Sequence, residues 1–335
     1  FQGEDDTYIV DYDTSGQALN LVYSGATIGW TPSSDIVNAL EPSPPATQKA
    51  IFGFGEVAGG TKQSLTNLVS SSGVVATDTT GVGTARAALA AAGYGFDKAI
   101  FGFGTTGSIT SITNLVSNSG VVATDTTGVG TARYYLAASS YGGDKAIFGY
   151  GYTSSVQNMS NLVSNSGVVA TDTTGVGSAR YFIAAAGYGG DKGIFGYGDA
   201  SGRTAITNLV SSSGVVSADV TGVGTVRDAL AAAGYGGDKA IFGYGNLPAR
   251  TAITNLVSNT GVVATDTAGV GTARATLAAA SYGGDKALFG YGQNSGGTRV
   301  SLKNLVSNTG VVAADVTGVG TARSSLAACG YSNSA

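Results

Sequence analysis

Short apolar runs alternate with glycine-rich turns along most of this sequence. After Arg133 the chain has a small apolar run (134–141), a Gly-Gly-Asp turn, a second apolar run (146–151), a variable segment, and two further short runs (160–164 and 167–171). Runs of four to eight residues bounded by Gly, Asn and Asp predict strands and turns. Glycine costs roughly 1 kcal/mol inside a helix, so this spacing of glycines disfavours helices. Each unit therefore predicts four strands joined as an up-and-down meander.

The unit recurs with an almost constant period. Its leading arginine stands at six positions, separated four times by 47 residues and once by 49: Arg86, Arg133, Arg180, Arg227, Arg274 and Arg323. A four-stranded unit repeated at this interval is typical of a propeller blade.

The two ends of the repeat region complement each other. A Phe-Gly-Phe/Tyr-Gly motif occurs six times, beginning at Phe52, Phe101, Phe148, Phe195, Phe242 and Phe289. The first copy lacks an Arg-led strand before it, and the last Arg-led strand, 323–331, lacks a second strand after it. We therefore expect an all-β fold, a six-bladed β-propeller of four-stranded blades over residues 49–335. Its C-terminal strand would pair with the first blade, which leaves no unpaired sheet edge at the seam.

The order of residues within the unit resembles the kelch repeat. Arg133, the Ala-rich strand that follows it and Ile147–Gly151 take the places of the kelch arginine, first strand and glycine-ended second strand. The kelch Gly-Gly doublet is here Gly-Tyr-Gly or Gly-Phe-Gly, and the downstream Trp is absent. The resemblance covers roughly residues 49 to 331 and implies a kelch-like propeller.

Residues 1–48 form a leader outside the repeat. It contains short apolar runs at 8–12, 17–23 and 26–32, a capped helical turn at 33–40 and a Pro-rich linker. The leader is too short for a core of its own, so we expect it to dock on the propeller or on another subunit. The stretch from Ser24 to Ser33 and the Gly/Ser/Thr/Ala-rich style are similar to proteins of bacteriophage tails and virion appendages. This resemblance implies an extracellular or virion location, with other virion subunits as partners through residues 1–48.

Composition excludes several function classes. Charged residues make up 11% of the 335 residues, against about 25% in ordinary domains, and the net charge is −4. A nucleic-acid partner is not expected, because it would need a basic face. Apolar runs all fall short of the ~18 residues of a membrane span, so we expect no membrane insertion. The chain has no histidine, which removes the Ser-His-Asp triad and histidine-ligated copper or zinc. We predict no enzyme activity, no cofactor and no metal.

Recurring polar residues have a structural interpretation. The aspartates of the Asp-x-x-Gly-Val-Gly motif are predicted to accept backbone N–H bonds, and the leading arginines to hold the loops that cross between blades. The aspartates stand at Asp78, Asp125, Asp172, Asp219, Asp266 and Asp315. One carboxylate per turn falls short of the six to eight oxygens of a calcium site. The single cysteine, Cys329, replaces an alanine of other units and is predicted to be a small buried residue.

Variation between units falls at two places, the tip between the second and third strands and the residue pair after each arginine. In an up-and-down blade both lie on one face of the disc, and differences between repeats that gather on one face indicate a binding surface. The candidate ligand-binding residues are Tyr134, Tyr135, Tyr152, Tyr181, Phe182, Asp199, Arg203, Asp228, Arg250 and Arg299. An aromatic cluster rimmed by polar groups suits a sugar, although the same aromatics could instead plug the central channel.

The sequence thus predicts a non-enzymatic, virion-associated propeller whose variable face binds a host cell-surface glycan or protein. Two alternatives remain open: a secreted or cell-surface lectin or adhesin, and a purely structural assembly protein. Carboxylate-pair glycoside hydrolysis would need a second acid close to Asp228, for which Asp199 and Glu56 are the candidates.

Overall fold

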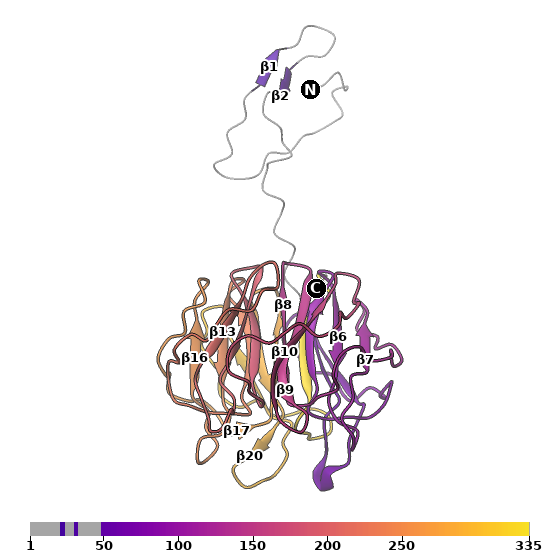
Figure 1. Cartoon of the computed structure of the whole chain (residues 1–335), viewed down its shortest axis with the longest axis vertical. Coiled ribbons are helices and arrows are strands. Elements are labelled where there is room, and N and C mark those ends of the chain that lie inside the picture. The colour runs from indigo at the N-terminus through magenta and orange to yellow at the C-terminus, as the bar shows by residue number, and fades with distance from the viewer. Residues whose placement is uncertain (1–20, 24–29, 33–47, 335) are drawn as a thin grey trace. The chain divides into compact units, whose positions relative to one another are not determined.

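The computed structural model describes residues 21–23, 30–32 and 48–334 (Figure 1). The chain divides into two units, residues 1–43 and 44–335. In the first unit, β1 (Leu21–Tyr23) pairs antiparallel with β2 (Trp30–Pro32). These two strands fall within predicted apolar runs. The strand expected at 8–12 and the helical turn expected at 33–40 lie outside the described residues.

The second unit is built from three-stranded antiparallel sheets, which we number in chain order. Sheet 1 has β22 (Ala327–Tyr331), β3 (Lys49–Gly53) and β4 (Thr66–Val69); sheet 2 has β5 (Ala90–Tyr94), β6 (Lys98–Gly102) and β7 (Thr113–Val116); sheet 3 has β8 (Ala137–Tyr141), β9 (Lys145–Tyr152) and β10 (Val156–Val163); sheet 4 has β11 (Ala184–Tyr188), β12 (Lys192–Gly196) and β13 (Thr207–Val210); sheet 5 has β14 (Ala231–Tyr235), β15 (Lys239–Gly243) and β16 (Thr254–Val257); sheet 6 has β18 (Ala278–Tyr282), β19 (Lys286–Gly290) and β21 (Lys303–Val306). A short pair, β17 (Arg274–Ala275) with β20 (Gln293–Asn294), is added beside sheet 6. Within the described ranges the helical content is one 3-10 turn, η2 (Ala58–Gly60).

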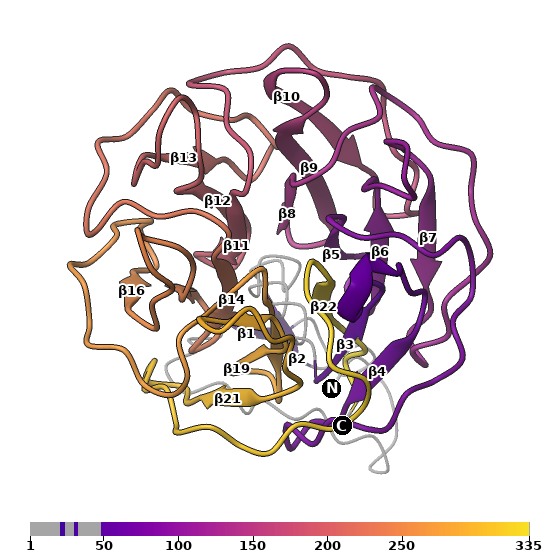
Figure 2. The ribbon, with the colours of Figure 1, turned by 90° about the horizontal axis from the view of Figure 1, so that it is seen from below.

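The sheets surround a common axis. The first strand of each sheet contacts the first strand of the next, and β22 contacts both β18 and β5 (Figure 2). Within sheet 1 the last strand of the chain pairs with β3, from Ala327 opposite Gly53 to Tyr331 opposite Lys49. This arrangement of small antiparallel sheets is β-propeller-like, and it confirms the predicted all-β class.

The middle strand of each sheet forms the core. Ile100 and Phe101 of β6 are fully buried because neighbouring sheets cover both faces of the strand. The packing explains one recurring glycine: a Cβ at Gly53 would lie 2.7 Å from the Phe101 ring of the next sheet. Gly53 is therefore needed for the close approach of sheets 1 and 2.

A left-handed aromatic residue lies at the centre of each Gly-Phe/Tyr-Gly motif. Phe54 has φ 64°, and the five equivalent residues have similar values. This conformation costs a residue with a side chain of order 1–3 kcal/mol, so the surroundings must stabilise it. The Phe54 ring packs at 5.2 Å from Phe101, and the guanidinium of Arg86 lies 4.4 Å from its centroid. The left-handed backbone thus places the ring beneath the arginine of the next sheet, a contact of about 2 kcal/mol when desolvated.

The leading arginines hold the loops that enter the sheets, as predicted. Arg86 is fully buried and donates to the carbonyls of Thr84 and Phe103 and to Asn114 Oδ1, at 3.2, 2.9 and 2.7 Å. Asn114 in turn donates to Asp125 Oδ1 at 2.9 Å. Asp125 also accepts the backbone N–H and the hydroxyl of Thr84. The aspartates therefore accept backbone N–H bonds, but from the incoming loop rather than from the turn that follows them.

This network sets the ionisation of the recurring aspartates. Burial alone would raise the pKa of Asp125, but hydrogen bonds from Thr84 and Asn114 and the charge of Arg86 outweigh it, so the pKa is lowered. The same groups lower the pKa of its five equivalents. Desolvation lowers the pKa of Arg86 to about 10, which leaves it charged at neutral pH.

The predicted fourth strand of each unit is wrong. The segment after β4 forms two isolated bridges, Thr66 with Thr79 and Val69 with Val75, instead of a continuous ladder. Between the bridges the register shifts by one residue, and the side chain of Asn67 donates to the carbonyl of Ala76 at 3.0 Å. The N–H of Ala76 still donates to the carbonyl of Leu68 at 2.8 Å, and Oδ1 of Asn67 accepts from the buried arginine Arg323 at 2.7 Å. The sheets consequently have three strands and a bridged outer segment.

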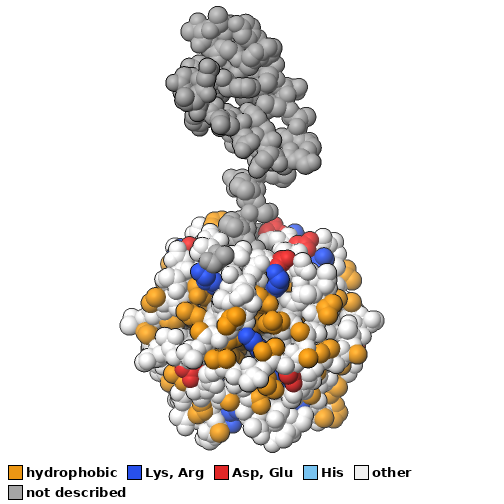
Figure 3. Space-filling model, turned by 180° about the vertical axis from the view of Figure 1, so that it is seen from behind, with side chains coloured by type: hydrophobic (Ala, Val, Ile, Leu, Met, Phe, Trp, Pro, Cys, Tyr) orange, Lys and Arg blue, Asp and Glu red, His pale blue; other side chains and the backbone are white. Residues whose placement is uncertain are grey.

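The face drawn in Figure 3 carries few charged and many apolar side chains. The first valine of the bridged segment is 60–66% exposed in every unit, at Val74, Val121, Val168, Val215, Val262 and Val311. Apolar side chains exposed singly are normal on soluble domains. Cys329 is buried as predicted, and burial raises the pKa of its thiol, which makes the thiol unreactive.

Candidate functional site

The backbone forms a ring at the end of the axis where the first strands begin. The second residue after each arginine donates its N–H to the carbonyl of the equivalent residue in the preceding sheet, at 2.8–3.0 Å, and the six bonds close into a circle. The six residues are Ala88, Tyr135, Phe182, Ala229, Thr276 and Ser325. All six have φ between 51° and 54°, so their side chains leave the ring in equivalent directions. We call this circle the mouth ring.

Beside the mouth ring, each sheet brings its variable positions together. In each sheet the first residue after the arginine forms a β-bridge with the first residue of the tip. In sheet 4, Tyr181 bridges to Asp199, and Asp199 bridges in turn to Arg203. The equivalent pairs are Ser324 with Glu56, Ala87 with Thr105, Tyr134 with Tyr152, Asp228 with Asn246 and Ala275 with Gln293. The two regions of sequence variation therefore meet on one face, as predicted.

Sheets 3 and 4 bring the predicted aromatic residues into mutual contact. The ring centroids of Tyr135 and Phe182 are 3.8 Å apart, and those of Tyr134 and Tyr135 are 4.7 Å apart. Tyr152 packs between Tyr134 and Tyr181, at 5.8 and 5.3 Å. We call these five residues the aromatic cluster. All five are partly exposed, so the cluster forms part of the surface of the mouth.

The aromatic cluster also covers part of the axis. Burial raises the pKa of Tyr135, and Glu56 raises it further, while a hydrogen bond with the Ser325 side chain lowers it. Ser325 belongs to the mouth ring two sheets away, so the Tyr135 side chain extends across the ring. Beneath it lies a cavity of about 100 Å³, lined by the mouth ring and by the next residue of each unit: Leu89, Leu136, Ile183, Leu230, Leu277 and Leu326.

Asp228 lies next to Tyr181 but below the surface. It is 6% exposed, and its Oδ2 forms an ion pair with Arg203 Nε at 3.1 Å. Its Oδ1 is buried without a hydrogen bond of normal geometry. Burial raises the pKa of Asp228; Arg203 and Asn246 oppose this shift and Asp199 adds to it. Sequence reasoning placed Asp228 near the mouth but did not foresee its burial.

In two of the predicted ligand-binding arginines the terminal guanidinium nitrogens have protein partners. Arg299 donates to Glu56 Oε1 at 2.6 Å and to Ser324 Oγ at 3.1 Å. Arg250 donates to the Gln293 side chain and to the carbonyl of Asn294. Both arginines thus tie the tip of one sheet to the next sheet. Within the described part of the chain, Arg203 pairs through Nε alone, which leaves its Nη1 and Nη2 unpaired.

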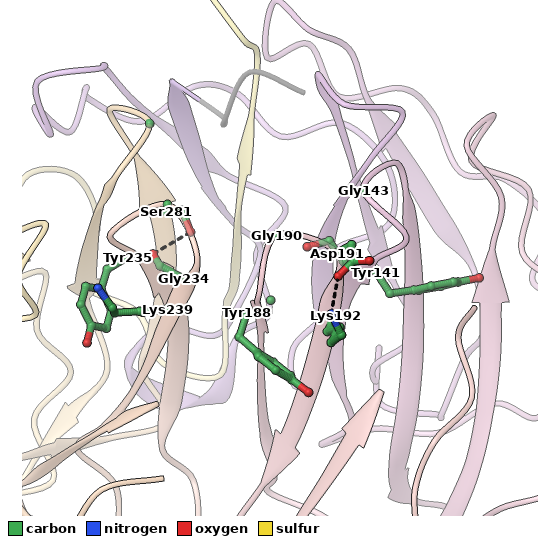
Figure 4. Close-up of a pocket in the computed structure, with 14 residues that line it drawn as sticks. Tyr141, Gly143, Tyr188, Gly190, Asp191, Lys192, Gly234, Tyr235, Lys239 and Ser281 are labelled. Atoms are coloured by element: carbon green, nitrogen blue, oxygen red, sulfur yellow. Dashed lines mark hydrogen bonds and ion pairs between the residues drawn. The ribbon is translucent and has the colours of Figure 1, made fainter. Parts of the chain in front are cut away.

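A second cavity, of about 140 Å³, was not expected from the sequence (Figure 4). It lies at the other end of the first strands and is lined by glycines, Tyr188, Lys192 and Ser281. The Ser281 hydroxyl donates to the carbonyl of Gly234 at 2.9 Å, and Asp191 pairs with Lys192 at 2.9 Å. The sequence offered no signal for this cavity, because the lining residues recur almost unchanged in every unit.

The described residues contain no group of three or more His, Cys, Asp or Glu placed to hold a metal. Among them we also find no helix of the length and hydropathy that a membrane crossing requires.

Comparisons with known proteins define the fold but not the function. No family model and no curated protein matches the chain. Among solved structures, the chain is similar to the "Structure of YjhT", with 11% sequence identity and a TM-score of 0.59. The similarity covers 78% of this chain and 95% of that chain. At this identity the similarity supports the propeller-like architecture alone.

Proposed function

We propose that residues 49–335 form a closed six-bladed β-propeller and that its variable face is a glycan-binding site without catalytic activity. The closed architecture is supported by the pairing of β22 with β3, by the contacts of successive first strands, and by the hydrogen-bonded mouth ring. A ring of repeats presents one face made of loops, where ligands of repeat proteins bind.

The aromatic cluster carries the proposal of glycan binding. A contiguous apolar patch, unlike a single exposed side chain, marks an interaction site. Five aromatic residues meet at the mouth, while the equivalent positions elsewhere hold small or polar residues. Apolar ring faces with a few placed polar groups are the usual lining of small-ligand sites. Arg203, Asp199 and the buried Asp228 supply such polar groups beside Tyr181.

The setting we propose is a virion appendage whose host-facing surface is this site, with residues 1–48 docked on other virion subunits. The support is the resemblance of composition and of residues 24–33 to phage-tail proteins. A secreted lectin would have the same site but no assembly partner for the leader. Size analysis of the chain with and without residues 1–48 distinguishes the two settings.

A competing hypothesis is that the aromatic residues only plug the central channel, and one observation favours it. Tyr135 stacks on Phe182 and reaches Ser325, as a residue that merely plugs the axis would.

The test is glycan-array binding by the intact chain and by a variant with Tyr134, Tyr135, Tyr181 and Phe182 changed to Ala. A matched control is Phe96→Ala, which removes a 46% exposed aromatic from the turn between β5 and β6.

We expect binding that the fourfold variant loses and the Phe96→Ala variant keeps. If the intact chain binds no glycan while the fourfold variant is folded but less stable, the aromatic residues serve as a plug and the proposed function is wrong.

A further inference from the structure

Sheet 4 differs from the other sheets in the chemistry of its three bridged positions. Tyr181 bridges to Asp199, and Asp199 bridges to Arg203, so an aromatic ring, a carboxylate and a guanidinium follow one another across the face. In sheet 2 the same positions hold Ala87, Thr105 and Ile109, and in sheet 3 they hold Tyr134, Tyr152 and Val156. Among these, sheet 4 alone offers a stacking surface, an acceptor and a donor side by side.

The polar groups of sheet 4 have unused hydrogen-bonding capacity. Asp199 Oδ1 accepts the backbone N–H of Gly202 at 3.1 Å, and no described residue donates to Oδ2. Arg203 is 37% exposed in its side chain and is bound at Nε by Asp228, so Nη1 and Nη2 remain at the surface. A guanidinium held by Nε is a preoriented pair of donors.

Asp228 explains why Arg203 is preoriented. Its side chain is 9% exposed, its Oδ2 is ion-paired with Nε at 3.1 Å, and its Oδ1 has no hydrogen bond of normal geometry. A buried polar atom without a partner is costly, and such costs gather at functional sites. The acid is too deeply buried to serve as a ligand contact, which makes it a positioning residue for Arg203.

We propose that Tyr181, Asp199 and Arg203 form the primary subsite of the glycan-binding face, and that the subsite takes a neutral pyranose through a free vicinal diol. This assignment rests on the proposed function. One hydroxyl of the diol donates to Asp199 Oδ2, and the neighbouring oxygen accepts from Arg203 Nη1 or Nη2. The apolar C–H face of the sugar stacks on Tyr181.

The charges around the subsite select against an acidic sugar. Asp199 and Asp228 are both close enough to Tyr181 to raise its pKa, whereas Arg203 is the single cation paired within this group. A carboxylate or sulfate on the ligand would face two negative charges and one positive charge, so its approach is disfavoured. A diol needs both a donor and an acceptor and matches the pair.

The test measures binding by calorimetry with methyl glycosides of neutral hexoses, their 3,4-di-O-methyl derivatives and methyl hexuronides. Asp199→Ala, Arg203→Gln and Tyr181→Ala should each weaken the binding of a neutral hexoside about tenfold, because each removes one contact of roughly 1–1.5 kcal/mol. The matched control is Asp238→Ala, which removes an exposed carboxylate at the other end of sheet 5. Methylation of the diol should abolish binding, and the hexuronide should bind more weakly than the hexoside.

The role of Asp228 in positioning Arg203 is tested by the affinities of two Asp228 variants. Asp228→Asn keeps an acceptor for Arg203 Nε and should retain most of the affinity, while Asp228→Leu should lose as much affinity as Arg203→Gln. A merely structural role would make affinity follow the melting temperature instead. A further variant changes only Tyr134 and Tyr135 to Ala. Tighter binding of hexuronides, or binding that this double variant loses while the Asp199 and Arg203 variants keep it, would overturn this assignment alone. Absence of glycan binding by the wild-type chain would overturn the proposed function as well.

Discussion

Arg86 provides the sharpest test of how the repeat framework is held together. Changing it to Met keeps an unbranched side chain over the Phe54 ring but removes all three hydrogen bonds of the guanidinium. The carbonyls of Thr84 and Phe103 and the Oδ1 of Asn114 are then left without their donor. An orphaned buried acceptor costs about 1–3 kcal/mol. Breaking a buried charged network by removing one member costs about 3–5 kcal/mol, and we expect a loss in this range.

The expected change in melting temperature follows from the size of the unit. Unfolding entropy is about 2.1 cal/mol/K per residue, or about 0.6 kcal/mol/K for residues 48–334, so the loss corresponds to about 5–8 °C. The control is Lys98→Met, which also removes one positive charge but from a half-exposed pair with Asp97. Pairs of that kind contribute at most about 1 kcal/mol. Differential scanning calorimetry measures both variants. Equal shifts for Arg86→Met and Lys98→Met would refute the reasoning that the arginine network, rather than charge number, stabilises the fold.

Three further predictions concern ionisation and closure. The folded pKa of Asp228 is raised, so its ionisation costs stability as pH rises through that pKa. The Asp228→Asn variant should therefore be more stable than wild type at pH 7. In acid titrations of the melting temperature, this difference should shrink below about pH 4. The folded pKa of Asp125 is lowered, so the stabilisation that its ionised form provides is present above the unfolded pKa of about 3.9 and is lost as pH falls through the folded pKa. The Asp125→Asn variant should have a lower melting temperature at pH 7 and a flatter dependence of that temperature on acid pH. An unchanged dependence would contradict the network described above. Deleting residues 327–335 removes β22 and should leave the edge of β3 unpaired, giving an aggregating chain that a peptide of residues 323–335 returns to a monomeric elution volume.

The periodic part of the fold was predictable because each local signal agreed with the others. The Gly-Gly-Asp turn at 142–144 joins β8 to β9 as expected, since both glycines take positive φ. The complementary ends predicted the pairing of β22 with β3. The fourth strand was predicted wrongly because a Val-rich run looks the same in sequence whether it pairs in one register or, as here, shifts its register between two bridges. The role of Asn67 depends on an arginine 256 residues away, which no local pattern reveals.

The candidate site was predictable in position but less so in chemistry. Repeat variation correctly located the aromatic cluster, because equivalent positions of equivalent units must lie on one face. All three arginines reach a partner in the next sheet, but Arg250 and Arg299 do so through terminal guanidinium nitrogens, whereas Arg203 meets the buried Asp228 through Nε. Burial and pairing across sheets are tertiary properties, so the sequence alone could not separate a surface group from a tie between sheets.

The mouth ring explains how one framework can carry such different side chains. Its six hydrogen bonds join backbone atoms only, and Ala88, Tyr135, Phe182, Ala229, Thr276 and Ser325 share nearly the same left-handed φ. Since the bonds do not depend on side chains, substitution at these positions changes the surface of the mouth without breaking the ring. The left-handed backbone carries a cost of order 1 kcal/mol per residue, and glycine would avoid it. The chain instead keeps side chains at all six positions, as the binding role proposed for the mouth requires.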